Sequence, residues 1–245
     1  MNDRMMAFAA GLSAMNEALD WNALGDLYCH DGGGSFFADE QREAIQDSGL
    51  LFAGDLGDKL GSFGKHPARS LYVGSGVAEI VPILFESIVL ARDVRLVNIA
   101  GPEVVALNAA FEAAEGPAGQ KLPRFKTDPI DPDIAPRIDH LWFVSVLTDP
   151  EAFPALHDQL YERQGSAAAV GGGHPKAERR AAFELCLQAA AKLTPPAILT
   201  TTDEELPMLT RACADLKLDV HAPATARLSG IVGDAVRHCQ IRPVQ

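Results

Sequence analysis

Basic side chains are scarce in this sequence relative to acidic ones. Its 245 residues include 21 lysines and arginines against 33 aspartates and glutamates, for a formal net charge of -12. A protein that wraps nucleic acid or lies on an anionic membrane needs a basic surface. The composition therefore predicts a small-molecule or protein partner, and neither nucleic acid nor a membrane.

Cysteine is also rare, and no two cysteines form a Cys-x-x-Cys pair. The four are Cys29, Cys186, Cys213 and Cys239. This spacing indicates neither a zinc ribbon nor a disulfide framework, and it fits a reducing cytoplasm. The His-Glu-x-x-His spacing is missing too, and the acidic run from Asp128 to Asp133 lacks the glycine and terminal glutamate of a calcium loop. We expect no bound metal.

Long hydrophobic runs are absent. Charged residues such as Glu79, Glu86 and Arg92 interrupt the most apolar region, so no window approaches the roughly 20 apolar residues of a membrane span. The apolar stretch from Met5 to Met15 lacks a convincing cleavage site, and its spacing predicts a helix. We expect a soluble, cytoplasmic protein.

What the sequence does contain is a strand, a tight turn and a helix between Arg69 and Glu79. Four residues suited to a strand run into Gly74-Ser75-Gly76, and a long apolar segment follows. Gly74 supplies the backbone angles of the turn, and Gly76 lets a ligand lie against the main chain near the first helical N–H groups. The pattern predicts a site for a nucleotide-like ligand. A hydrolase is disfavoured, because the serine lies inside the turn and no Gly-x-Ser-x-Gly elbow is present.

Further β-α units follow this turn. The periodicity predicts strands over Val94–Ile99, 124–127, Ile138–Leu147 and Ala197–Thr201, and helices over 101–116, 148–164, 176–193 and 204–216. Gly233-Asp234 is expected to turn the last two extended stretches, Ala226–Val232 and Ala235–Arg242, into an antiparallel hairpin. Such alternation predicts an α/β fold: a Rossmann-like three-layer sandwich whose mostly parallel sheet ends in that hairpin.

Helices precede the sheet, and they predict a domain of their own. Apolar residues recur at helical spacing from Met5 to about Asp20 and again from Asp39 to about Phe63. We expect an N-terminal helical cap over residues 1–66 and a Rossmann-like domain over residues 67–245. The glycine-rich loop from Cys29 to Phe37 ends in an exposed-looking pair, Phe36-Phe37, and is either a lid over the site or a plain connection between helices.

The order of elements resembles the fold of class I S-adenosylmethionine-dependent methyltransferases, over roughly Arg69 to the C-terminus. The turn Val73-Gly74-Ser75-Gly76-Val77-Ala78 is similar to the first motif of that family, and Ile138–Leu147 is similar to its fourth. The resemblance implies S-adenosylmethionine as cofactor and a possible homodimer. The cofactor-binding residues that it implies are Gly74, Ser75, Gly76, Asn98, Ile99, Asp128, Val144, Ser145 and Val146.

Two positions depart from the family pattern. Tyr72 stands where an acidic residue often precedes the first glycine, and Asn98 stands where a carboxylate usually accepts hydrogen bonds from the ribose. An amide oxygen still accepts such bonds, without the charge that strengthens them. These departures keep a second function open, a methyltransferase-like protein that serves as a binding or assembly subunit without catalysis.

An NAD(P)-dependent oxidoreductase is a third candidate within the same architecture. Its fingerprint requires a third glycine where this chain has Glu79, and that side chain would bring negative charge near a pyrophosphate. S-adenosylmethionine carries no phosphate, so the sequence favours methyl transfer to a small-molecule acceptor.

No catalytic base stands out in the sequence. Methyl transfer from a sulfonium depends chiefly on proximity and alignment, so the protein need not supply a nucleophile. His30 and His174 are the weak candidates, because each lies in a glycine-rich loop, while His140 lies early in a buried strand and is expected to be structural.

Overall fold

The computed structural model describes residues 3–28, 36–61, 68–127, 130, 137–161 and 174–244. Its contacts divide the chain into two compact units. The first comprises Met1–Pro129 and Arg227–Gly233, and the second comprises Ile130–Ala226 and Asp234–Gln245. The boundary predicted near residue 66, between a cap and a core, stays a prediction.

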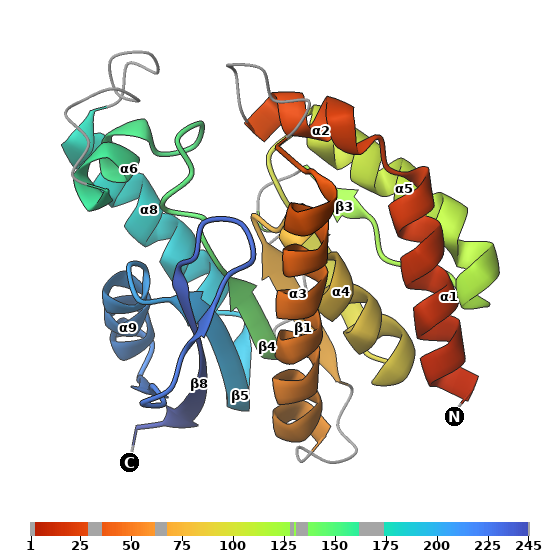
Figure 1. Cartoon of the computed structure of the whole chain (residues 1–245). Helices are drawn as coiled ribbons and strands as arrows, with labels where there is room; N and C mark the ends of the chain where they lie inside the picture. The colour runs from red at the N-terminus through yellow and green to blue at the C-terminus, as the bar shows by residue number, and fades with distance from the viewer. Residues whose placement is uncertain are drawn as a thin grey trace. The chain divides into compact units, whose positions relative to one another are not determined.

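The first unit begins with the predicted helices and continues into parallel strands (Figure 1). Its α-helices are α1 (Asp3–Ala18), α2 (Trp21–Tyr28), α3 (Asp39–Leu60), α4 (Ile80–Leu84) and α5 (Pro102–Ala118). Its strands are β1 (Arg69–Val73), β2 (Asp93–Val97), β3 (Phe125–Lys126) and β7 (Arg227–Leu228). Strand β2 lies between β1 and β3 and is parallel to both, so the carboxyl ends of these strands meet at one edge.

The apolar segment after the glycine turn is one continuous helical stretch that changes its winding. It starts as a 3-10 turn over Val77–Glu79, continues as α4 and ends as a π-helical turn over Phe85–Val89. Every residue of α4 is buried, as expected for a helix that is apolar on all faces. Helix α3 packs against α4 so closely that a Cβ added at Gly49 would lie 2.7 Å from Val81 Cβ.

Helix α5 continues past Gly116, the residue at which we predicted its end. It runs past Gly116 and Pro117 and stops at Gly119, which has φ 66° and donates its N–H to the Glu115 and Gly116 carbonyls. The left-handed conformation suits glycine and satisfies carbonyls at the helix end. The predicted stop at Gly116 is therefore wrong.

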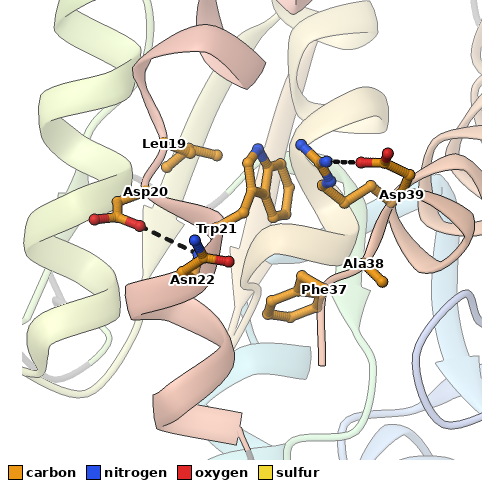
Figure 2. Close-up of a pocket in the computed structure, with 8 residues that line it drawn as sticks. Leu19, Asp20, Trp21, Asn22, Phe37, Ala38 and Asp39 are labelled. Carbon is orange, nitrogen blue, oxygen red and sulfur yellow. Dashed lines mark hydrogen bonds and ion pairs between the residues drawn. The ribbon is translucent and has the colours of Figure 1, made fainter. Parts of the chain in front are cut away.

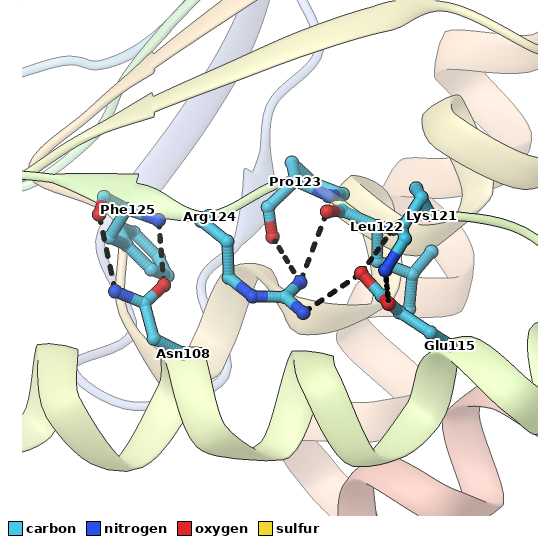
Figure 3. A network of polar contacts seen from close by, with 7 residues as sticks. All are labelled: Asn108, Glu115, Lys121, Leu122, Pro123, Arg124 and Phe125. Atoms are coloured by element: carbon cyan, nitrogen blue, oxygen red, sulfur yellow. Dashed lines mark hydrogen bonds and ion pairs between the residues drawn. The ribbon is translucent and has the colours of Figure 1, made fainter.

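Strand β3 is short, and side chains of α5 and the preceding loop hold it in place (Figure 3). Asn108 Nδ2 donates to the Phe125 carbonyl at 3.2 Å, and Asn108 Oδ1 accepts the Phe125 N–H at 2.7 Å. Glu115 pairs with Arg124 and Lys121, both at 2.8 Å. These contacts align the strand although it offers few backbone bonds of its own.

The second unit contains the remaining elements. Its strands are β4 (Ile138–Phe143), β5 (Leu193–Thr202), β6 (Leu218–His221) and β8 (Ala235–Pro243), and its helices are α6 (Pro154–Leu160), α8 (Pro175–Ala190) and α9 (Leu206–Asp215). Strand β5 is parallel to β4, whereas β8 is antiparallel to both β5 and β6. The predicted fold class is thereby confirmed: an α/β chain of mostly parallel strands with an antiparallel C-terminal end.

Two element boundaries differ from the sequence prediction. Of the stretch 226–232, which we expected to be extended throughout, only Arg227–Leu228 is a strand. Strand β4 ends at Phe143, four residues before the predicted end at Leu147. The reason is that Ser145 adopts φ 58°, a left-handed conformation that a strand does not accommodate.

Candidate functional site

The glycine turn of the first unit has the predicted geometry. Gly74 directly follows β1 and has φ 66°, in the region that glycine adopts without steric cost. Its N–H donates to the Val97 carbonyl, the last residue of β2, at 2.8 Å. The turn is thereby fixed to the neighbouring strand at the edge where the parallel strands end.

Two carboxylates meet the backbone N–H groups that the turn exposes. Glu79 Oε2 accepts the Gly76 N–H at 2.8 Å, and Glu103 Oε1 accepts the Val77 N–H at 3.1 Å. N–H groups at the start of a helix attract negative charge. Here the chain's own acidic side chains satisfy them, which makes the turn locally acidic.

Two flexible side chains lie in the space beside the Cα of Gly76. A Cβ built there would lie 2.6 Å from Glu103 Oε1 and 3.0 Å from the Tyr28 hydroxyl oxygen. Tyr28 donates its hydroxyl to Glu103 Oε1 at 2.7 Å. The main chain of Gly76 therefore lies against the Tyr28–Glu103 pair, in the space that the sequence analysis assigned to a ligand.

The side chain of Asn98 connects the end of β2 to the glycine turn. Its Nδ2 donates to the Ser75 carbonyl at 2.8 Å, and its Oδ1 accepts the Ile99 N–H at 2.7 Å. The Ser75 side chain is fully buried, while Ile99 is exposed. The predicted ribose contact of Asn98 stays a prediction, but both ends of this amide already have backbone partners, one in the turn and one at Ile99.

Tyr72 does not face the turn. Its side chain is fully buried, and its hydroxyl donates to Glu86 Oε1. Glu86 is equally buried, pairs with Arg92 at 2.9 Å and accepts the Ser70 hydroxyl. Burial, and after it the negative charge of Glu86, raises the pKa of Tyr72 well above its ordinary value. The tyrosine that replaces the expected acid therefore belongs to an internal polar cluster.

In the second unit, the loop after β4 begins with Val144, Ser145 and Val146. These residues were predicted to lie in the strand, which ends at Phe143. The carboxylate of Glu205 holds this loop, since it accepts the Ser145 N–H at 3.1 Å and the Leu147 N–H at 2.7 Å. Burial raises the pKa of Glu205 to about 7, although the hydrogen bonds that it accepts act in the opposite direction.

A second carboxylate contacts the same loop. Ser145 Oγ donates to Asp234 Oδ2 at 3.2 Å, and the Tyr161 hydroxyl donates to the same oxygen at 3.0 Å. Burial raises the pKa of Tyr161 to about 12, and the charge of Asp234 acts in the same direction. Tyr161 therefore stays a hydrogen-bond donor at neutral pH.

The remaining candidates from the sequence are Asp128 and three histidines. Asp128 and His30 lie outside the described residues. His174 is exposed and precedes α8 as its N-cap residue, without a side-chain capping bond. His140, expected to be structural, is fully buried in β4 and shares a hydrogen bond with Thr200 Oγ1 at 2.9 Å.

The N-terminal helices of the first unit line an open pocket of about 510 Å³, and Figure 2 shows the side chains around it. Its lining residues are Leu19, Asp20, Trp21, Asn22, Phe37, Ala38, Asp39 and Arg42. Phe37 is 3% exposed, so the expectation of an exposed aromatic pair is wrong for it. Its ring packs against Trp21 at 5.5 Å and against Tyr28 at 5.0 Å between centroids.

Two glutamates that shape these loops were not predicted from the sequence. Glu103 follows Gly101-Pro102 in the first turn of α5, and Glu205 lies between the end of β5 and the start of α9. An acidic residue at the first turn of a helix after a β-strand is a usable signal, but it is also common for reasons of helix stability.

Within the described part of the chain, no cluster of three or more histidine, cysteine, aspartate or glutamate side chains is arranged to hold a metal ion. No described helix combines the length and apolarity needed to cross a membrane.

No protein-family profile matches the chain, and no curated protein matches its sequence. Solved structures do resemble it. The O-methyltransferase from Bacillus cereus, in complex with SAH, has a TM-score of 0.47 and 12% identity, with 94% of this chain and 91% of that one covered. The glycopeptide N-methyltransferase MtfA, complexed with sinefungin, has a TM-score of 0.48 and 13% identity over 80% of this chain and 87% of its own.

TrmN from Thermus thermophilus has a TM-score of 0.47 and 17% identity, with 79% of this chain covered. The match spans about half of that protein, 51% of its chain. The chain is thus similar to structures named as methyltransferases. We therefore assign the fold from the strand order of this chain and propose the function from the residues of the site.

Proposed function

We propose that this protein uses S-adenosylmethionine to methylate a small-molecule acceptor. The observation that carries the proposal is the glycine turn after β1, where Gly74 adopts a left-handed conformation and carboxylates meet the N–H groups of Gly76 and Val77. In an open sheet of parallel strands, ligands bind at the carboxyl ends of the strands. The turn occupies that position in the first unit.

The charge at the turn selects among nucleotide-like ligands. Glu79 and Glu103 both direct carboxylate oxygens at the turn, where a dinucleotide would place its pyrophosphate. Like charges repel at such distances, whereas a sulfonium or an ammonium group is attracted. The acidic turn therefore supports a cofactor without phosphate, and it disfavours the NAD(P)-dependent alternative.

The residues proposed to hold the cofactor are those that the sequence resemblance implies. The backbone of Gly74–Gly76 would contact its methionine part, and Asn98 and Ile99 would contact its ribose. Asp128 is proposed for the adenine, and Val144, Ser145 and Val146 for the methionine end. When bound, S-adenosylmethionine supplies an electrophilic methyl group. The chain's own contribution is then to orient the two reactants and exclude water.

The small-molecule acceptor rests on two features. The net charge of -12 disfavours a nucleic-acid acceptor, since phosphates would be repelled. The open pocket beside Trp21 and Phe37, of about 510 Å³, offers room and two aromatic rings to a small acceptor. The acceptors in the names of the matched structures vary, from a glycopeptide to a ribosomal protein, and they support no choice among classes.

The test is direct binding followed by substitution at the turn. Calorimetry should detect binding of S-adenosylmethionine and of its demethylated product, and none of NAD⁺. Gly76→Val should abolish the binding, because its side chain would enter the space beside the main chain. Gly54→Ala is the control, since an added Cβ there meets nothing within 4 Å. Unchanged affinity in a folded Gly76→Val variant would overturn the proposal.

A second candidate function is a methyltransferase-like subunit that binds or assembles without catalysis. The observation in its favour is the Tyr28–Glu103 pair, which fills the space beside Gly76. Mass spectrometry of the purified protein distinguishes the two functions. Co-purified cofactor supports methyl transfer, whereas the absence of both co-purified and titrated cofactor supports the non-catalytic subunit.

A further inference from the structure

The geometry points to a latch, formed by Tyr28 and Glu103, that closes the glycine turn until a ligand displaces it. This inference rests on the proposed function in one respect, namely that the ligand lies against Gly76.

One carboxylate oxygen of Glu103 contacts Tyr28, Val77 and the space beside Gly76. Glu103 Oε1 accepts the Val77 N–H at 3.1 Å and the Tyr28 hydroxyl at 2.7 Å. The same oxygen lies 2.6 Å from the position of a Cβ at Gly76. The carboxylate therefore lies against the main chain of Gly76, on the side where a ligand would contact that glycine.

The pair is able to move. Tyr28 is 37% exposed, and Glu103 is half-buried on the first turn of α5. A hydrogen bond between exposed side chains is readily exchanged for bonds to water, so its net contribution to stability is small. The carboxylate of Glu103 is thus held over Gly76 by contacts that a ligand can replace.

Tyr28 connects the latch to the open pocket among the N-terminal helices. Its ring stacks on Phe36 at 5.7 Å and meets Phe37 edge to face at 5.0 Å. Phe37 in turn contacts Trp21, and both line the pocket. Displacement of Tyr28 would therefore change the surroundings of Trp21, because Phe37 contacts both rings.

A closed latch should weaken ligand binding by a measurable factor. If the closed latch excludes the ligand, the apparent dissociation constant is the intrinsic one divided by the open fraction. Tyr28→Phe removes the hydroxyl that holds Glu103 and keeps both the ring and the charge of the site. We expect this variant to bind S-adenosylhomocysteine about fivefold more tightly than the wild type, which corresponds to one weak hydrogen bond.

The experiment is a double-mutant cycle measured by calorimetry with S-adenosylhomocysteine. Tyr28→Phe should tighten binding in the wild-type background and have no effect in the Glu103→Ala background, where no carboxylate remains to be held. Glu17→Gln is the control for an exposed helix carboxylate that accepts one hydroxyl, here from Ser13 at 2.9 Å, and it should not change the affinity. Circular dichroism verifies that each variant is folded.

A spectroscopic readout tests the connection to the pocket. The chain has two tryptophans, Trp21 and Trp142. Ligand binding to the wild type should change the tryptophan fluorescence, and Trp21→Phe should abolish that change. Tyr28→Phe should reduce it, because binding no longer has to displace the ring.

The outcomes separate the latch from the function. Unchanged or weaker binding by Tyr28→Phe overturns the latch while the proposed function stands, and so does an equal gain in the Glu103→Ala background. Absence of binding by the wild type and by every latch variant overturns the proposed function together with the latch.

Discussion

Two loops of this protein follow a parallel strand and are held by a glutamate, and they differ in how deeply that glutamate is buried. After β1, Glu103 accepts the Val77 N–H from a half-buried position. After β4, Glu205 accepts the Ser145 and Leu147 N–H groups and is fully buried. Water is able to replace the first carboxylate but not the second, so the same chemistry produces a displaceable contact in one loop and a permanent one in the other.

The largest loss of stability is expected when the contacts of Glu205 are removed. Glu205→Ala leaves the buried Leu147 N–H and the part-buried Ser145 N–H without this acceptor, and it should lower the free energy of unfolding by about 3 kcal/mol. Urea unfolding followed by circular dichroism measures it. Glu205→Gln keeps an amide oxygen as acceptor and should lose about half as much. A loss below roughly 1 kcal/mol in the alanine variant would show that the loop does not depend on this carboxylate.

The pH dependence of stability tests the burial of Glu205 in another way. The pKa of Glu205 is about 7 in the folded protein against 4.5 for an ordinary glutamate, so the folded state binds more protons between these values. Stability therefore falls as pH rises from about 4.5 to 7 and is then level, with a contribution of roughly 3 kcal/mol.

Unfolding measured across that pH window checks the sign. Glu205→Gln should remove the slope, and Glu184→Gln, on the exposed side of α8, should keep it. A wild-type stability that rises over the window would contradict the raised pKa of Glu205.

A smaller effect is expected at the contact that joins the glycine turn to β2. Asn98→Asp replaces the Nδ2 donor by an oxygen that faces the Ser75 carbonyl, so it should cost about 1 kcal/mol of stability. The sequence alone predicts tighter cofactor binding for this variant, since a carboxylate strengthens bonds from ribose hydroxyls. Dissociation constants and unfolding curves, measured at one pH and ionic strength, weigh the two. Tighter binding without loss of stability would favour the ribose contact over the contact with Ser75.

The smallest effect completes the comparison. Glu103→Ala should lower the free energy of unfolding by less than about 1 kcal/mol, because water takes over the exposed bond of Tyr28 and reaches the part-buried Val77 N–H. The measurement is the urea titration used for Glu205→Ala, which is its matched counterpart. If both variants lost the same stability, the contrast between a displaceable and a permanent contact would be wrong.

Much of the fold could be predicted because it depends on local pattern. The helices before the glycine turn, the strands β1 and β2 and the antiparallel end of the chain all follow from apolar periodicity and from glycine or proline at element ends. The element boundaries that were wrong, at Gly116 and at Leu147, depend on left-handed residues, Gly119 and Ser145, whose conformation is fixed by hydrogen bonds to carbonyls or carboxylates.

The glycine turn after the first strand could be predicted from the sequence, since Gly74 adopts a positive φ and only glycine does so without cost. The sequence did not determine what lies against that turn. Glu103 and Tyr28 are 75 residues apart and meet only in the folded chain. Periodicity reports which face of an element is buried, whereas the partner of a polar side chain is decided by three-dimensional proximity, and that is why the tertiary structure alone brought the Tyr28–Glu103 pair to Gly76.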